Sequence, residues 1–116
     1  MSHPDTVPEA VTLDELTGDP HAEVFDTPRP RAVRLRLTAG ESVPPHTHPD
    51  SDVVIHVLDG RIALGVDDET YDLDAGQVIR FSGRREVAPE AVTDATALVV
   101  FAPARDGKQG FRVDGK

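Results

Sequence analysis

The sequence predicts an all-β antiparallel fold, and three features of the chain support this prediction. Short apolar segments recur from residue 31 onward, at the spacing typical of an antiparallel sandwich or barrel. Pairs and triplets containing Gly or Asp, which favour tight turns, separate these segments. Within residues 34–38, apolar and charged side chains alternate with a period of two, as in a half-buried strand.

The length of the chain favours a single domain. With 116 residues it can form one modest core and is too short for two. We expect an N-terminal tail, short helix and arm over residues 1–30, a barrel over residues 31–103, and a C-terminal extension over residues 104–116.

The N-terminal region is predicted to contain one short helix. Thr12 and Glu15 fit a capping box, in which each side chain bonds a free amide at the helix start, and Gly18 and Pro20 end the helix. Residues 24–30 are marked by prolines and are expected to form an extended arm or an edge strand.

The predicted strands follow from residue 31. Alternation over residues 34–38 directs the leucines toward a core and the arginines toward water. Further strands are expected at residues 53–58, 61–66, 70–73, 77–81 and 97–102, and the arginines expected to face solvent are Arg34, Arg36, Arg61 and Arg80.

The segment 53–58 is apolar on both faces apart from His56, so both faces of that strand are expected to be covered. A small barrel buries only its inner face. The outer face is then covered either by a second subunit, in a homodimer, or by the N-terminal arm. His56 is expected to point outward.

Composition excludes several classes of function. Twenty-one acidic against twelve basic residues give a net charge of -9, which argues against partners such as nucleic acid or an anionic membrane. The chain has no cysteine, so disulfides and thiolate-bound metals are excluded. The first thirty residues contain no apolar run that fits a signal sequence or membrane span, and we expect a soluble, cytoplasmic protein.

The most informative stretch is residues 40–49, which contains two histidines separated by one residue. On an extended segment, His46 and His48 project from the same face, and Pro44 and Pro45 stiffen the approach. Neutral imidazoles bind divalent Zn, Fe, Mn, Ni or Cu. The alternative is a structural pair whose ring nitrogens are hydrogen-bonded within a loop.

Residues 46–60, followed by the turn at residues 74–76 and another apolar strand, resemble the cupin superfamily, with a first motif like that of germin-type cupins. The resemblance covers residues 31–103. It implies an antiparallel jelly-roll barrel in which two histidines and a glutamate of the first motif, and a histidine of the second, hold one metal. His46 and His48 match this pattern, whereas valines occupy the other two ligand positions, Val53 and Val87.

Two acidic neighbours of these valines are candidate substitutes. A local bulge or a gapped alignment on Gly83 brings Glu86 to the ligand position, giving a site of two histidines and one carboxylate. Asp52, beside Val53, is the second candidate. Otherwise Glu86 is a surface charge and Asp52 belongs to a polar loop.

Three functions follow from this degenerate ligand set. The first, which we favour, is a metal-capable barrel that binds a small molecule, without established catalysis. The second is a metal-dependent oxygenase or isomerase that uses the histidine pair and a carboxylate. The third is a metal-free structural or sensor barrel.

Overall fold

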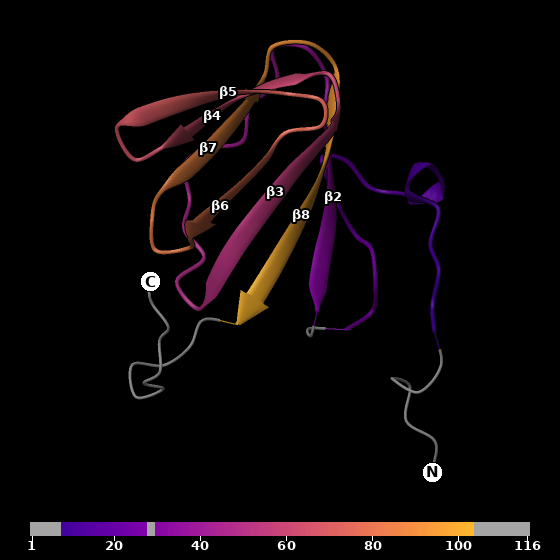
Figure 1. Cartoon of the computed structure of the whole chain (residues 1–116). Coiled ribbons are helices and arrows are strands. Elements are labelled where there is room, and N and C mark those ends of the chain that lie inside the picture. The colour runs from indigo at the N-terminus through magenta and orange to yellow at the C-terminus, as the bar shows by residue number, and fades with distance from the viewer. Residues whose placement is uncertain (1–7, 28–29, 104–116) are drawn as a thin grey trace.

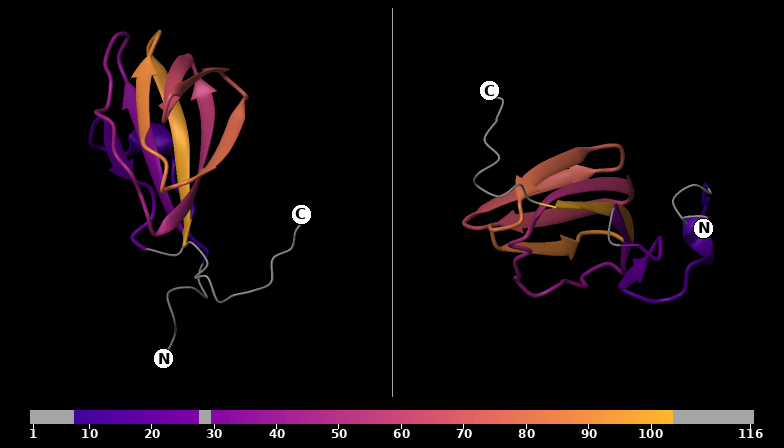
Figure 2. Two further views of the ribbon diagram at one scale, coloured as in Figure 1. Left: turned by 90° about the vertical axis from the view of Figure 1, so that its left-hand side faces the viewer. Right: turned by 90° about the horizontal axis from the view of Figure 1, so that it is seen from below.

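The computed structural model describes residues 8–27 and 30–103, and the predicted C-terminal extension at 104–116 lies outside them. Within these residues the chain forms two antiparallel sheets (Figures 1 and 2). One sheet has the strand order β1-β2-β8-β3-β6 and the other the order β5-β4-β7. The strands are β1 (His21–Glu23), β2 (Arg31–Leu37), β3 (Ser51–Asp59), β4 (Arg61–Val66), β5 (Glu69–Asp74), β6 (Val78–Ser82), β7 (Val87–Ala91) and β8 (Ala95–Pro103). The predicted all-β antiparallel fold is confirmed.

The two sheets face each other (Figure 2). Side chains from both sheets form the core between them, and in β3, β4, β7 and most of β8 buried positions alternate with more exposed ones. In β3, for example, Val53, Ile55 and Val57 are buried, while the residues between them are only half-buried. The period of two that the sequence shows therefore sets which residues enter the core. The core also includes Leu35, Leu37, Ile62, Leu64, Phe81, Val87, Val99 and Phe101.

The strand β7 was not among the predicted strands, and its composition explains why. Pro89 lies in its middle, and a proline cannot donate a ladder hydrogen bond. β7 can accommodate it because it is the edge strand of its sheet, paired with β4 on one side.

The turn between β3 and β4 depends on a glycine, as its position in the sequence suggested. Gly60 has a positive φ of 80°, and a Cβ atom there would collide with the backbone oxygen of Asp94. Only glycine meets both conditions without strain.

The N-terminal region differs from the prediction. The helix is reduced to a single 3-10 turn, Leu13–Glu15, and the Thr12 side chain makes no capping hydrogen bond. The backbone oxygen of Thr12 instead accepts a bond from the Glu15 amide at 3.0 Å. The edge strand lies at His21–Glu23, before the proline-marked segment, because Ala22 can be buried there while β1 pairs with β2.

The prediction that Arg34 faces solvent is wrong. Its side chain is fully buried, and its guanidinium donates hydrogen bonds of 2.7 Å to the backbone oxygens of Leu13 and Gly18, with Asp19 at 3.4 Å. Alternation correctly assigned Arg34 to the outer face of the sheet, but the segment before β1 covers that face. Arg61 and Arg80 are exposed, and Arg36 is partly exposed.

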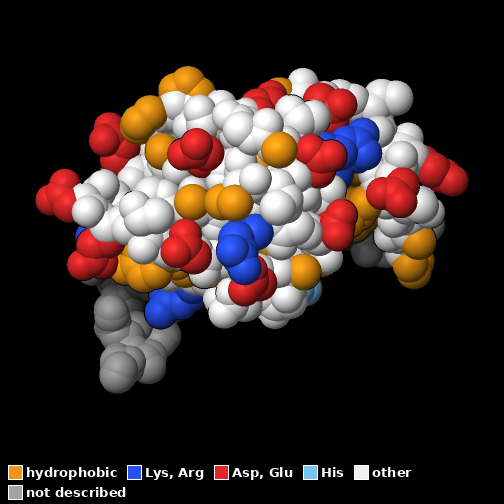
Figure 3. Space-filling model, turned by 90° about the horizontal axis from the view of Figure 1, so that it is seen from above, with side chains coloured by type: hydrophobic (Ala, Val, Ile, Leu, Met, Phe, Trp, Pro, Cys, Tyr) orange, Lys and Arg blue, Asp and Glu red, His pale blue; other side chains and the backbone are white. Residues whose placement is uncertain are grey.

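The surface carries the acidic excess of the composition. Asp and Glu side chains are spread over the face shown in Figure 3, among few Lys and Arg. Among the described residues, no helix is long and apolar enough to cross a membrane.

Candidate metal and ligand site in the barrel

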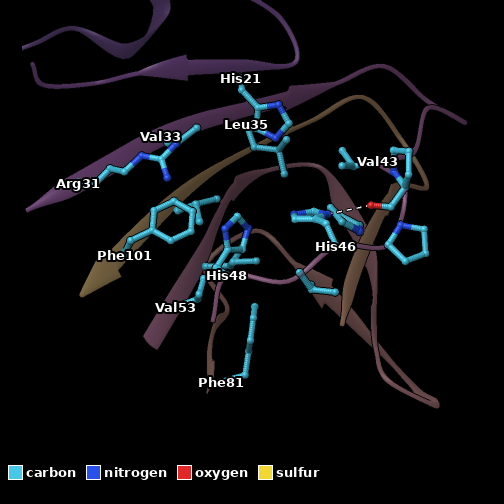
Figure 4. Close-up of a pocket in the computed structure, with 16 residues that line it drawn as sticks. His21, Arg31, Val33, Leu35, Val43, His46, His48, Val53, Phe81 and Phe101 are labelled. Carbon is cyan, nitrogen blue, oxygen red and sulfur yellow. Dashed lines mark hydrogen bonds between the residues drawn. The ribbon is translucent and has the colours of Figure 1, made fainter. Parts of the chain in front are cut away.

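A pocket of about 480 Å³ opens into the interior between the sheets, and both predicted metal-binding histidines line it (Figure 4). Its volume lies in the range of small-molecule sites. Most of its wall is apolar and comes from Val33, Leu35, Val43, Val53, Ile55, Phe81, Val87, Val99, Phe101 and the prolines at positions 44, 45 and 89.

Backbone hydrogen bonds hold the histidine loop against β7 and the turn before it. His46 and Val87 exchange two backbone bonds, of 3.1 and 2.9 Å, and the His48 amide donates to the Gly83 oxygen at 2.7 Å. A Cβ atom at residue 83 would collide with the backbone oxygens of His48 and Ser51. Gly83 is thus required for the close approach that positions His48.

The two imidazoles lie next to each other, with ring centroids 4.8 Å apart and planes perpendicular. The Nδ1 atom of His46 is 2.8 Å from the backbone oxygen of Pro44. Because a carbonyl oxygen can only accept, Nδ1 carries a proton, and in the neutral ring the lone pair is therefore on Nε2. His48 also packs on Phe101, at a centroid distance of 4.7 Å.

Burial keeps His48 in the neutral form that a metal requires. Desolvation lowers the pKa of His48 below its ordinary value, and the proximity of the basic groups His46, Arg31 and His21 lowers it further. At neutral pH its imidazole is therefore uncharged and has a lone pair available.

The structure places the two valines, and not their acidic neighbours, at the pocket. Val53 and Val87 both line it. Glu86 is exposed, and its amide donates to Asp67 at 2.9 Å on the surface. Asp52 has the opposite parity to Val53 in β3 and does not line the pocket. No bulge in the described ladders turns either carboxylate inward: the register of β3 with β6 is continuous from Asp52, and that of β7 with β4 is continuous from Val87, the residue after Glu86.

The spacing of the His46 and His48 rings is compatible with both imidazoles binding one metal ion. Two imidazoles bound to one ion at about 2.1 Å have their ring centres roughly 5 Å apart, which matches the histidine pair. Within the described part of the chain, no group of three or more His, Asp or Glu side chains can hold a metal. Water or a bound ligand would therefore have to complete the coordination of a metal held by the pair, because no carboxylate of the described residues lies with the two histidines.

Sequence reasoning missed two further basic residues of the pocket, His21 and Arg31. His21 belongs to the three-residue strand β1, which is too short for its alternation of apolar and polar residues to predict a strand. Desolvation lowers the pKa of His21, and His46 and Arg31 lower it further. Arg31 reaches the pocket because the register of β2 with β8 places it opposite Phe101, with its Cζ atom 4.6 Å from the ring centroid. A single sequence does not reveal that register.

Solved structures with the same fold come from several bacteria. KdgF from Halomonas sp. is 24% identical, with a TM-score of 0.66 over 76% of this chain and 81% of its own. A predicted oxalate decarboxylase from Thermotoga maritima is 21% identical, with a TM-score of 0.73 over 83% of this chain and 100% of its own. A protein of Thermus thermophilus, TT1209, is 26% identical, with a TM-score of 0.68 over 83% of this chain and 98% of its own.

No curated protein matches the chain. The family model described as the cupin domain matches residues 33–103, which is more than half of the sequence. This match agrees with the barrel, with the pocket between its sheets and with the histidine pair on the loop before β3. The chain belongs to the cupin domain family.

Proposed function

We propose that this barrel binds a small organic molecule in its pocket and holds a divalent metal beside it through His46 and His48. The observation that carries the proposal is that both imidazoles line an otherwise apolar pocket of about 480 Å³. The metal polarises or anchors a polar group of the ligand when it is bound. The apolar wall binds the remainder of the ligand by removing its surface from water.

The chemistry of the pair supports the metal-binding part of the proposal. The neutral tautomer of His46 that donates to Pro44 has its lone pair on Nε2, and burial favours neutral His48. The bond from His46 to Pro44 also fixes the ring orientation, as partners of metal-binding histidines do. Because no carboxylate joins the pair within the described residues, we propose binding and not the oxygenase or isomerase reaction.

Elemental analysis of protein purified without an affinity tag tests the metal site. We expect the wild-type chain to take up about one equivalent of Zn²⁺ or Ni²⁺ on titration, and the His46→Ala, His48→Ala double variant to bind at least about tenfold more weakly. His56, which lies outside the pocket, supplies the control. His56→Ala is expected to retain wild-type metal content. Equal metal binding by the double variant would contradict the proposal and favour a metal-free structural pair.

We also propose that the chain forms a homodimer through the outer face of β3, β6 and β8. Register places Val78, His56 and Leu98 side by side on that face, next to Val54 and Val100. Val78 is 57% exposed, and the N-terminal segment covers the outer face at β2 instead. An isologous contact between two copies buries this apolar row.

Sedimentation analysis tests the dimer. Val78→Glu places a charge within the contact and is expected to yield monomers at concentrations where the wild type is dimeric. Val92 is 50% exposed and lies away from the proposed contact, so Val92→Glu is the matched control and is expected to remain dimeric. A monomeric wild type would overturn the proposal.

A further inference from the structure

The pocket has a charge opposite in sign to that of the whole protein. The chain carries a net charge of -9, yet the ionisable side chains among the described residues that line the pocket are all basic: Arg31, His21, His46 and His48. Figure 4 shows these four side chains pointing toward the same pocket from different strands and the loop. Such a segregation of charge favours an anionic group on the ligand.

Arg31 has the geometry that binds a carboxylate. Its Nε and Nη2 atoms donate to Glu23, at 3.1 and 2.7 Å, and no described residue bonds its Nη1 atom. A guanidinium offers five N–H groups, so the Nη1 side, together with the second hydrogen of Nη2, remains available for a second carboxylate. Glu23 does not line the pocket and acts as a positioning residue, because it fixes one edge of the guanidinium.

Two neighbours reinforce this assignment. The Arg31 guanidinium rests on Phe101, and Phe101 also contacts the His48 ring. Because both side chains contact the Phe101 ring, Arg31 and His48 lie close to each other in the pocket. Arg31 supplies the permanent positive charge at this point of the pocket.

The rest of the pocket sets the character of the ligand beyond its charged group. Val33, Leu35, Ile55 and Val99 form an apolar wall beyond the basic residues. A volume of about 480 Å³ accommodates a compact ring or a short chain. The ligand class that fits these features is a small carboxylic acid with an apolar body.

We propose that the pocket binds a small organic carboxylate, whose carboxylate group pairs with the free edge of the Arg31 guanidinium while its apolar body packs against the barrel wall. This inference rests on the proposed function, because it names the ligand class of the same pocket. It does not require the metal, since Arg31 is separate from the histidine pair.

Titration of metal-free protein with sodium benzoate and with benzamide, followed by ¹H–¹⁵N NMR, tests the proposal. The two probes have nearly the same shape and differ in charge, and removal of metal prevents direct coordination of the carboxylate. We expect benzoate to bind at least about tenfold more tightly than benzamide, and Arg31→Gln to abolish this preference.

Control variants separate the role of Arg31 from loss of folding or of net charge. Arg36→Gln removes one positive charge outside the pocket and is expected to leave benzoate binding unchanged. Arg31→Lys keeps the positive charge but lacks the planar guanidinium, which can donate two parallel hydrogen bonds to a carboxylate. This variant is expected to bind benzoate with intermediate affinity. Glu23→Gln, which loosens one edge of Arg31, is expected to weaken benzoate binding less than Arg31→Gln does.

The outcomes distinguish this proposal from the proposed function. If benzamide binds as tightly as benzoate, or if a folded Arg31→Gln variant keeps the preference, the carboxylate assignment is overturned while small-molecule binding stands. If neither probe shifts the resonances of the pocket residues, the ligand-binding part of the proposed function fails as well. Metal uptake by the histidine pair is measured independently of both.

Discussion

Replacing Val53 with Glu and Val87 with His is expected to tighten divalent-metal binding by a factor of at least about 100. Both valines line the pocket that contains the histidine pair, and Val87 lies directly opposite His46 across a backbone bridge. The double substitution adds a carboxylate and an imidazole to two imidazoles already present, which completes a four-ligand set. Metal titration by calorimetry measures the gain.

The same experiment tests the register of both strands. Val54→Glu with Ala88→His introduces the same groups one residue along β3 and β7, at positions that do not line the pocket. This control pair is expected to leave metal affinity unchanged, because alternation directs those side chains away from the histidine pair. We further expect the Val53→Glu, Val87→His protein to be less stable than the wild type without metal and to regain stability with it, since Val53 is only 1% exposed. If it gains no affinity over the control, the correspondence of the two valines to ligand positions is wrong.

Replacing Arg34 with Met is expected to lower the free energy of unfolding by about 2–4 kcal/mol. Arg34 is fully buried and donates to the backbone oxygens of Leu13 and Gly18, so it connects the N-terminal segment to β2. Methionine fills a similar space but donates no hydrogen bond. The Nε atom of Arg34 has no partner in the described residues, which reduces the stabilisation that Arg34 provides. Urea denaturation measures the loss.

A second readout shows where the loss occurs. Limited proteolysis in the N-terminal segment is expected to become faster in Arg34→Met, because that segment loses its attachment before the barrel unfolds. Arg36→Met is the matched control: Arg36 pairs with the same Asp19, at 3.0 Å, but is partly exposed, so its loss is expected to cost less than about 1 kcal/mol. Equal stability of the Arg34 and Arg36 variants would contradict the anchoring role of Arg34.

Most of the barrel strands, though not β7, and the histidine pair could be predicted because their signals are local. Alternation within β2 and β3 assigns each residue to a face, and the turn at Gly60 follows from a residue that tolerates positive φ. The spacing of His46 and His48 is likewise enough to predict that the two rings meet. The prediction of these features required no knowledge of how distant segments pack.

The remaining features depend on contacts between distant segments, which periodicity does not describe. The burial of Arg34 follows from coverage of the outer face by residues some twenty positions earlier. Arg31 enters the pocket only through its pairing with the end of β8, seventy residues away in sequence. The inability of Glu86 to replace a missing ligand follows from the β7 register, which keeps Val87 inward.

The short strand β1 contributes little to the core but much to the pocket: Ala22 is its one buried residue, whereas His21 lines the pocket and Glu23 orients Arg31. Selection can therefore act on this strand almost independently of the barrel. Substitutions at residues 21 and 23 would alter which ligands are accepted, at little cost to the packing between the sheets. A lineage of such barrels can thus diverge in ligand preference while its scaffold is conserved.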